Sequence, residues 1–238
     1  MSELINGVWY DSCNDGFTEG WTVAGYDANS MQDDVIVRTE IRGLPVIAIN
    51  LQAFMNAPMT TISFPDTIKE IGAEAFKNCK NLKQVYRGAT RHPEARKKIF
   101  VYSRVFEDCD NLEMVFMGQK TAISLCGAGN FSGCKKLKIV EGKITSSLPA
   151  SSFRDCNNLQ NLHLFERVDF FETCFINCNS LAQLYFENTN CIKMPEAIKD
   201  VLRTKIVYCD KGSKAIQDLA YEGLNVTVLE TIENFHGI

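Results

Sequence analysis

Hydrophobic residues recur along this chain at a spacing that holds through six copies. Each copy contains a phenylalanine that follows Ala, Val, Asn, Ser or Cys, and the six are Phe54, Phe76, Phe106, Phe131, Phe153 and Phe175. Their separations are 22, 30, 25, 22 and 22 residues. Because the pattern resumes in register after the two wide gaps, we interpret these gaps as insertions into a repeat of about 22 residues.

Three more hydrophobic positions follow the phenylalanine in each repeat. After the last five phenylalanines comes a cysteine, and these are Cys79, Cys109, Cys134, Cys156 and Cys178. Next come Leu82, Leu112, Leu137, Leu159 and Leu181, and then Val85, Val115, Val140, Leu162 and Leu184. In the first repeat, Ala57, Met59 and Ile62 hold these positions. A unit of this size cannot close its own core, so stacked copies must bury each column against its equivalents.

The two halves of the repeat predict different local structures. The Leu-x-x-Val half has strand character, and the Ala-Phe-x-x-Cys half predicts a short helical turn. Equivalent strands would pair in parallel, about 4.8 Å apart. The pattern therefore predicts a solenoid of six stacked repeats, α/β to mostly β, with parallel strands.

The first 44 residues predict a β-type cap for the open end of the stack. Residues 7–10 and 20–26 are expected to form two strands, joined by a turn at residues 14–16. Trp9 and Trp21 are expected to cover the first repeat, because a bare end would expose the core.

Residues 191–238 predict an α/β cap at the other end. We expect a helix from Pro195 to Arg203, a strand over residues 205–208, a helix capped by Ser213 that ends at Gly223, and a strand over residues 226–229. No linker rich in Pro, Gly or Ser divides the chain. We therefore predict one domain over residues 1–238, with the repeats in residues 45–190.

The most regular repeat copy runs from Ile71-Gly72 through Ala75-Phe76, Cys79 and Leu82 to Val85. This copy resembles the BspA-like leucine-rich repeats, also called the Treponema pallidum type. Three other segments also fit the family pattern: Ile62-Ser63-Phe64-Pro65, the lead-in of residues 40–46 and the exit of residues 207–214. The resemblance covers about residues 34–230. It implies a curved leucine-rich-repeat solenoid with adhesion or binding roles at a cell surface or in secretion, and it brings no catalytic residues.

Composition and charge limit the other possibilities. The chain has 238 residues, of which 45% are hydrophobic and 23% charged, as in a folded protein. A formal net charge of −4 argues against a general nucleic-acid binder. No apolar run of about 18 residues exists, so no transmembrane segment is predicted. The first residues lack a leader pattern, so either the chain stays inside the cell or a leader has been removed.

The cysteine column is expected to consist of buried, free thiols. Equivalent side chains in a stack point in parallel directions, which is wrong for a disulfide. The chain has ten cysteines but no CxxC pair and only three histidines, so no metal site is predicted. Cys13, Cys126, Cys191 and Cys209 lie off the column. Free thiols favour a reducing, cytoplasmic location, against the surface location that the resemblance implies.

Motifs of catalysis are not found in the sequence. The glycines of Leu125-Cys126-Gly127-Ala128-Gly129 are interpreted as a turn, and no P-loop, nucleophile elbow or dinucleotide fingerprint is present. Cys191 with His163 is a conceivable catalytic pair, although nothing in their spacing favours it. We predict no catalytic residue, no cofactor and no enzymatic activity.

One stripe of residues is expected to point outward from the strands. Period-2 alternation turns the residue after each Val or Leu outward, and these residues are Ser63, Tyr86, Phe116, Glu141, His163 and Tyr185. The neighbouring outward column contains Thr61, Gln84, Met114, Ile139, Asn161 and Gln183. Tyr86, Met114, Phe116, Ile139, His163 and Tyr185 are candidate partner-binding residues, because such residues are enriched in interfaces. The alternative is that an insertion or a cap folds over Phe116 and Met114.

The segment from Lys77 to Arg104 carries nine basic residues against Glu94 alone, a net charge of +8. We predict that the insertion within it forms an exposed basic arm, with Arg91, Arg96, Lys97 and Lys98 as candidate contacts. A sulfated or carboxylated glycan, an acidic protein or an anionic membrane would each fit. The alternative is a solvated loop without a partner.

The sequence thus favours a non-catalytic binding or adhesion module that recognises a protein or an acidic glycan through the strand face and the basic insertion. Two alternatives stay open: a thiol-dependent enzyme of unknown reaction, and a structural spacer without its own partner. Nucleic acid is not an expected partner, and the sequence leaves the oligomeric state open.

Overall fold

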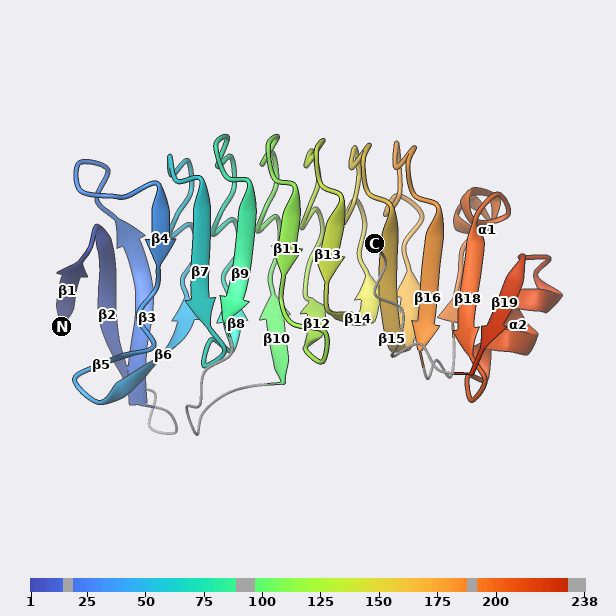
Figure 1. Ribbon diagram of the computed structural model, residues 1–238, viewed down its shortest axis with the longest axis horizontal. Helices are drawn as coiled ribbons and strands as arrows, with labels where there is room; N and C mark the ends of the chain where they lie inside the picture. The colour runs from blue at the N-terminus through green and yellow to red at the C-terminus, as the bar shows by residue number, and fades with distance from the viewer. Residues whose placement is uncertain (15–18, 89–96, 188–191, 231–238) are drawn as a thin grey trace.

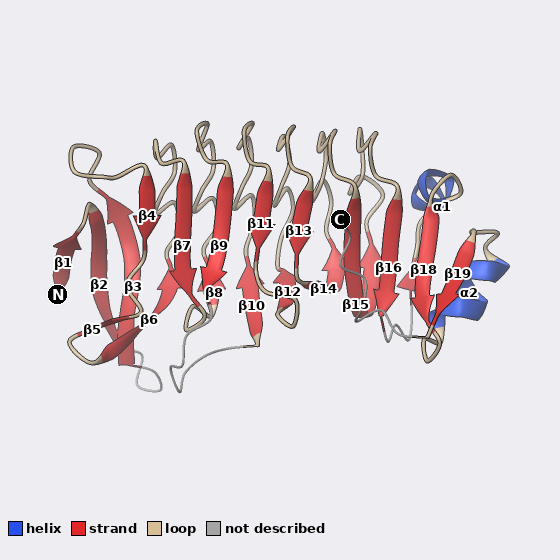
Figure 2. Ribbon diagram, viewed as in Figure 1, coloured by secondary structure: helices blue, strands red, loops and turns tan. Residues whose placement is uncertain are grey.

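The computed structural model describes residues 1–14, 19–88, 97–187 and 192–230. The chain winds into an elongated solenoid whose strands run across the long axis (Figure 1). Strands account for most of the regular structure, and helices lie only near the C-terminal end of the described chain (Figure 2). Each repeat places one strand on the front of the solenoid as drawn in Figure 1 and a second strand behind it.

The front strands are the ones that the repeat predicts. They pair in parallel in the order β4 (Asp34–Ile36), β7 (Thr61–Pro65), β9 (Gln84–Gly88), β11 (Met114–Phe116) and β13 (Ile139–Glu141). The line continues beside β13 with β15 (Asn161–Phe170), β16 (Gln183–Glu187), β18 (Ile206–Asp210) and β19 (Val226–Leu229). The register aligns Ile62, Val85, Val115 and Val140, and all four are buried. The predicted parallel stack is therefore confirmed.

The back strands were not predicted. They are β6 (Leu44–Ile49), β8 (Glu70–Ile71), β10 (Lys98–Val101), β12 (Ala122–Leu125) and β14 (Lys143–Leu148). The second half of β15 pairs with β14, and β17 (Ile192–Lys193) pairs with β15. Each repeat thus closes its core between two sheets.

The Phe-x-x-Cys half of the repeat is not the predicted helical turn. It is a run of turns in which some backbone N–H groups bond to the next repeat: Phe76 N donates to Val105 O at 2.9 Å, and Asn78 N donates to Glu107 O at 2.8 Å. Lys77 N and Cys79 N, in contrast, bond within the repeat, three residues back. Glu74 (φ 57°) and Asn78 (φ 59°) adopt the left-handed conformation on either side of Phe76. All inner donors of a helix bond within the helix, whereas here Phe76 N and Asn78 N are directed along the stack. The helical-turn prediction was wrong for this reason.

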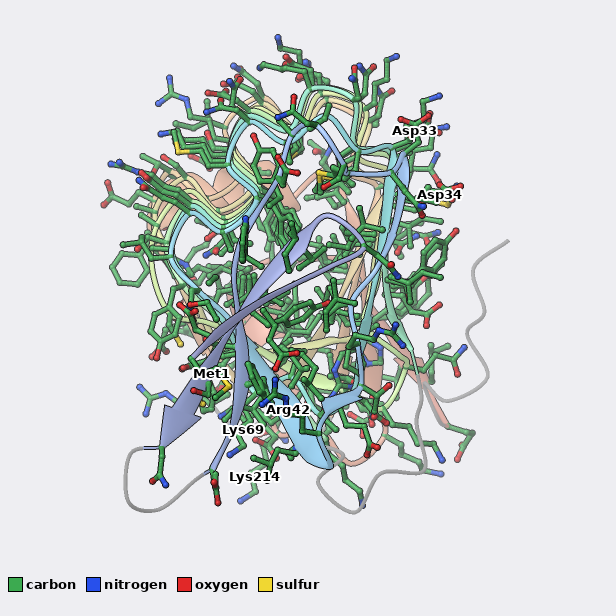
Figure 3. All side chains as sticks on the ribbon, turned by 90° about the vertical axis from the view of Figure 1, so that its left-hand side faces the viewer. Met1, Asp33, Asp34, Arg42, Lys69 and Lys214 are labelled. Atoms are coloured by element: carbon green, nitrogen blue, oxygen red, sulfur yellow. The ribbon has the colours of Figure 1, made fainter. Side chains whose placement is uncertain are left out.

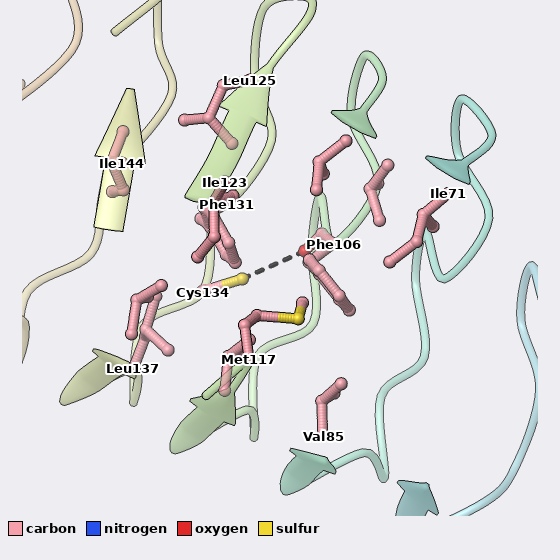
Figure 4. Close-up of a cluster of buried hydrophobic side chains, with 14 of the residues drawn as sticks. Ile71, Val85, Phe106, Met117, Ile123, Leu125, Phe131, Cys134, Leu137 and Ile144 are labelled. Carbon is pink, nitrogen blue, oxygen red and sulfur yellow. Dashed lines mark hydrogen bonds between the residues drawn. The ribbon is translucent and has the colours of Figure 1, made fainter. Parts of the chain in front are cut away.

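The phenylalanine and cysteine columns form the centre of the core. The rings of Phe76 and Phe106 are 5.2 Å apart with 4° between their planes, and the neighbouring pairs are similar. The Cys134 thiol donates to Phe106 O at 3.0 Å (Figure 4). The other column cysteines donate in the same way to the phenylalanine of an earlier repeat. The column is free and buried, as predicted.

At the N-terminal end, the predicted hairpin forms from β2 (Val8–Asn14) and β3 (Glu19–Tyr26). The predicted turn lies partly outside the described residues. β1 (Ser2–Ile5) adds an unpredicted strand to the hairpin, and β5 (Glu40–Ile41) pairs with β6. Trp21 is buried in the core, but Trp9 is 39% exposed beside Leu4, its cross-strand partner. The expectation that both tryptophans cover the first repeat was wrong for Trp9.

The C-terminal elements match their predicted ranges closely. α1 (Glu196–Leu202) and α2 (Ala215–Tyr221) bury Ile198, Leu202, Ala215 and Leu219. The N-cap of α2 is Lys214 rather than Ser213, so the predicted cap was wrong by one residue. None of the described helices is long and apolar enough to cross a membrane.

Candidate functional site

Backbone register aligns the residues of the predicted outward stripe in two runs on the front strands. Backbone register pairs Ser63 with Tyr86, Tyr86 with Phe116, and Phe116 with Glu141. It also pairs His163 with Tyr185. The structure extends the column to Ile36 at one end and to Tyr208 at the other. We call these eight residues the front column: Ile36, Ser63, Tyr86, Phe116, Glu141, His163, Tyr185 and Tyr208.

An apolar patch lies in the first half of the front column. The rings of Tyr86 and Phe116 stack at 5.2 Å with 7° between their planes. The neighbouring outward column places Met114 and Ile139 beside them on β11 and β13. Tyr86 is 37% exposed, and the other three side chains are partly exposed. We call Tyr86, Met114, Phe116 and Ile139 the apolar patch.

The apolar patch is held in place by local contacts. The Tyr86 hydroxyl donates to Gln84 Oε1 at 2.6 Å, within the same strand. The Tyr185 hydroxyl makes the equivalent bond to Gln183 Oε1, also at 2.6 Å. A ring fixed by stacking and by one hydrogen bond loses little conformational freedom when a partner binds.

The second half of the front column is recessed. Tyr185 is only 6% exposed, which is contrary to the expectation that it is an exposed contact. Its ring stacks on Tyr208 at 4.9 Å and meets His163 edge-on at 6.4 Å, so both sides of the ring are occupied. Burial is the main cause that raises the pKa of Tyr185 to about 12. The sequence predicted the strand that contains Tyr208. It did not predict that Tyr208 belongs to the front column.

A polar group surrounds His163. Glu187 Oε2 lies 2.7 Å from His163 Nε2, and Glu187 Oε1 lies 2.5 Å from Lys143 Nζ. The Lys143 ammonium also lies 4.6 Å from the centre of the Phe165 ring. Burial lowers the pKa of His163 more than the Glu187 carboxylate raises it, so the imidazole is neutral at pH 7.

The thiols of the described chain do not form a catalytic arrangement with His163. Cys191, the cysteine of the conceivable pair, lies outside the described residues. Burial raises the pKa of Cys178 to about 12 and also raises the pKa of Cys156, so these two thiols are poor nucleophiles at neutral pH. Among the described residues, no group of three or more His, Cys, Asp or Glu could hold a metal ion. Residues 127–130 form the bend and turn that were expected of the short glycine segment.

Much of the predicted basic segment is neutralised. Lys77 Nζ lies 2.6 Å from Glu107, and Lys80 Nζ lies 2.6 Å from Asp110. Arg87 is half-buried and donates to Thr121 Oγ1 and to Asp66 O. The carboxylates come from later repeats, so a count along the sequence could not include them. The net charge of +8 therefore overstates the free charge of this segment.

The insertion is also not wholly an exposed arm. Residues 98–101 form β10 of the back sheet, with Ile99 and Val101 buried. Lys97 and Lys98 are exposed, whereas Arg91 and Arg96 lie outside the described residues. The short run of β-branched and aromatic residues Ile99-Phe100-Val101 was the signal that this part is a strand.

The two-sheet coil, its buried leucine column and its parallel register define a leucine-rich-repeat solenoid. The family model "BspA type Leucine rich repeat region (6 copies)" matches residues 47–140 and 90–198, which together are more than half of the chain. The chain therefore belongs to the BspA-type leucine-rich-repeat family.

Three solved structures of leucine-rich-repeat proteins are similar to this chain. The leucine-rich-repeat protein of T. pallidum is 19% identical, with 82% of this chain and 92% of that chain covered and a TM-score of 0.56. A leucine-rich-repeat protein of Bacteroides capillosus is 18% identical, with 59% and 97% covered and a TM-score of 0.45. A leucine-rich cell surface protein of Faecalibacterium prausnitzii is 16% identical, with 98% and 96% covered and a TM-score of 0.43. At such identities the likeness concerns the fold alone. No curated protein matches the chain.

Proposed function

We propose that the chain is a binding module that recognises a protein partner through the apolar patch of the front sheet. The observation that carries this proposal is the stacked, outward-facing pair of Tyr86 and Phe116, with Met114 and Ile139 beside it. Adhesion, the role that the family resemblance implies, would use this same face.

The surroundings of the apolar patch have the layout of an interface. Ser63, Thr61 and Gln84 lie on one side of it, and Glu141 lies on the other side along the front column. An apolar centre with a polar rim is the usual anatomy of a protein–protein interface, and Tyr, Phe and Met are enriched in such centres. Nothing in the folding core requires aromatic side chains at these two outward positions, because the inward columns already fill the interior.

The test requires a partner and two double variants. A partner is first captured with the wild-type chain and identified, and its affinity is then measured by calorimetry. In Tyr86→Ala/Phe116→Ala we expect the affinity to fall by at least thirtyfold, because truncating a central aromatic residue costs about 2 kcal/mol or more. The matched control is Tyr221→Ala/Phe171→Ala, which removes one tyrosine and one phenylalanine that are 92% and 52% exposed elsewhere on the surface.

An unchanged affinity in the front-face variant would contradict the proposal, as would an equal loss in the control. Both variants should retain the far-ultraviolet spectrum and the unfolding midpoint of the wild type. The spacer alternative predicts that no captured protein is sensitive to any of these substitutions.

A further inference from the structure

We propose that the front sheet carries a second binding element at its open edge, β4, which takes an extended segment of a partner protein as an added strand. β4 is the first strand of the front sheet and pairs on one side with β7. No strand of the described chain pairs with its other side. An unpaired strand edge is a template for another chain, and an added strand binds mainly through main-chain hydrogen bonds. The element is distinct from the apolar patch, because it uses the backbone of β4 rather than the rings of Tyr86 and Phe116.

Alternate residues of β4 direct their backbone groups away from β7. Val37 N donates to Ser63 O at 2.8 Å, and Asp33 O accepts a hydrogen bond from the first residue of β7 at 3.1 Å. Successive residues of a strand turn their N–H and C=O groups to opposite sides of the ladder. Asp34 and Ile36 therefore direct these groups to the open side.

The next outward donor along the edge is already bonded to the N-terminal cap. Arg38 N donates to the hydroxyl of Tyr10, which lies on β2, at 3.1 Å. This bond agrees with the alternation along β4, and it marks where the open edge ends. Within the described parts of the chain, the outward backbone groups of Asp34 and Ile36 have no hydrogen-bond partner. These two residues of the edge can therefore pair with an added strand.

The outward side chains of the edge are acidic, apolar and basic in order. Ile36 is 72% exposed, and Asp34 and Arg38 on either side of it are also exposed. Thr61 Oγ1 donates to Asp34 Oδ1 at 2.6 Å, which holds the carboxylate at the edge. In the part of the chain that the structure describes, neither Asp34 nor Arg38 forms an ion pair. Opposite charges attract across neighbouring strands, so the matching segment carries a basic, an apolar and an acidic residue at alternate positions.

The start of the edge is accessible from the N-terminal end of the solenoid. Viewed from this end, Asp33 and Asp34 lie at the outer margin, well apart from Met1 and Arg42 of the cap (Figure 3). Asp33 is exposed like Asp34 and adds a second carboxylate at the start of the edge. The basic residue of the segment therefore meets two carboxylates.

The inner side of the edge limits the remaining positions of the segment. Val35 and Val37 are 4% and 3% exposed, and they belong to one buried cluster with Tyr10 of the cap. Segment residues that point to this side meet the cap, so small residues suit these positions.

A second copy of the chain does not fit this edge. The back sheet continues beyond β4 with β3, β2 and β1, which lie past the end of the front sheet (Figure 1). Two copies joined through their β4 edges, with their front sheets in line, would each place these three strands where the back sheet of the other copy lies. A single extended segment has no second sheet and avoids this overlap.

The test measures the binding of two fluorescein-labelled peptides to the full chain by fluorescence polarisation. The peptides are Thr-Lys-Thr-Val-Thr-Glu-Thr and its reverse, so that composition and net charge are the same. Only one direction can place lysine beside Asp34, valine beside Ile36 and glutamate beside Arg38. We therefore expect one peptide to bind about fivefold more tightly than the other, because cross-strand charge pairs select the direction.

Ile36→Pro removes an N–H group of the open edge and leaves the bonds to β7 in place. Proline is tolerated on an edge strand where the N–H group faces solvent. The affinity for the tighter peptide should fall about tenfold, because a main-chain hydrogen bond is lost. The matched control is Ile36→Val, which keeps the N–H group and a branched apolar side chain and should change the affinity less than about twofold.

Charge reversal tests the order of the side chains. Asp34→Lys should weaken binding of the tighter peptide about fivefold, and a peptide with glutamate in place of its lysine should restore the affinity. The front-face variant Tyr86→Ala/Phe116→Ala should bind the peptide like the wild type. A failure of the edge is thereby distinguished from a failure of the apolar patch.

Amide hydrogen exchange gives a readout that side-chain contacts alone would not move. At saturating peptide, the Ile36 N–H group should exchange about tenfold more slowly, because it gains a backbone acceptor. The Val37 N–H group, which already donates to Ser63 O, is the internal control and should change little.

Four results would overturn the proposal: no binding of either peptide by the wild type, equal binding of the two directions, no loss in Ile36→Pro, or an unchanged exchange rate at Ile36. Self-association of the chain that Ile36→Pro abolishes would assign the edge to a second copy instead.

Discussion

Removing one ring from the middle of the phenylalanine column tests how the repeats are held together. Phe131 is 1% exposed, and its ring centre lies 5.3 Å from that of Phe106 and 5.1 Å from that of Phe153. A buried Phe→Ala change costs about 3–5 kcal/mol. Each stacked pair adds about 0.5–1.5 kcal/mol beyond burial. Because Phe131 stacks on two neighbours, we expect Phe131→Ala to lower the free energy of unfolding by about 4–5 kcal/mol, in the upper part of the range for a buried phenylalanine.

Urea unfolding, followed by far-ultraviolet circular dichroism, measures this loss. With a slope of about 3 kcal/mol/M, the midpoint should fall by about 1.5 M. Phe131→Leu is the control, because it keeps most of the apolar volume and loses only the stacking. It should cost about 1–3 kcal/mol, the sum for two stacked pairs.

A comparison along the column sharpens the test. Phe175 has only one stacked neighbour in the column, Phe153 at 6.1 Å, so Phe175→Ala should cost less than Phe131→Ala. A loss below about 1 kcal/mol for Phe131→Ala would refute the reasoning, since a ring that supports two neighbouring repeats cannot be removed so cheaply.

Three further predictions concern the backbone, the thiols and the recessed histidine. Gly72→Ala should destabilise the chain by about 1–3 kcal/mol in urea unfolding, because the added Cβ would lie 2.5 Å from Leu51 N. Gly88→Ala is the control and should change the unfolding midpoint little, because no atom lies nearer than 3.9 Å to its added Cβ. Among the described cysteines, the exposed Cys126 should react first with a thiol reagent, and Cys134 should react only after unfolding. Peptide mapping that shows equal reaction rates for the two thiols would contradict the claim that the cysteine column is buried. The pKa of His163 is lowered from 6.5, so the unfolded chain binds more protons and stability should fall as the pH decreases from about 6.5 through the folded pKa. His163→Gln should lose less stability than the wild type between pH 7.5 and pH 5, and identical losses would exclude this role.

The sequence predicted the front sheet because its columns have a constant spacing. Leu82 and Val85 recur in every repeat with the same side chain or a close relative, and register follows from that repetition. The back sheet was missed because its strands are as short as two residues. Yet a buried column five residues before the phenylalanine marks it, in Ile49, Ile71, Val101, Leu148 and Phe170. Reading that column would have given the second strand.

The candidate site was predicted in arrangement but not in exposure. Alternation placed Tyr185 outward, but the recess that buries it depends on Tyr208 and His163 in adjacent strands. Likewise, Lys77 and Lys80 looked like free charges because their carboxylate partners, Glu107 and Asp110, are about 30 residues away in sequence and one repeat away in space. Lateral contacts between repeats decide both outcomes, and a count along the chain does not contain them.

The most direct test of the account is photo-crosslinking from the front column to the captured partner. A photoreactive phenylalanine analogue replaces Ser63, which pairs with Tyr86 at the rim of the apolar patch. The same analogue at Tyr221, a fully accessible position on α2, is the control. Our account predicts a crosslink from position 63 and none from position 221. A crosslink from position 221 alone would contradict the claim that the front sheet is the binding face.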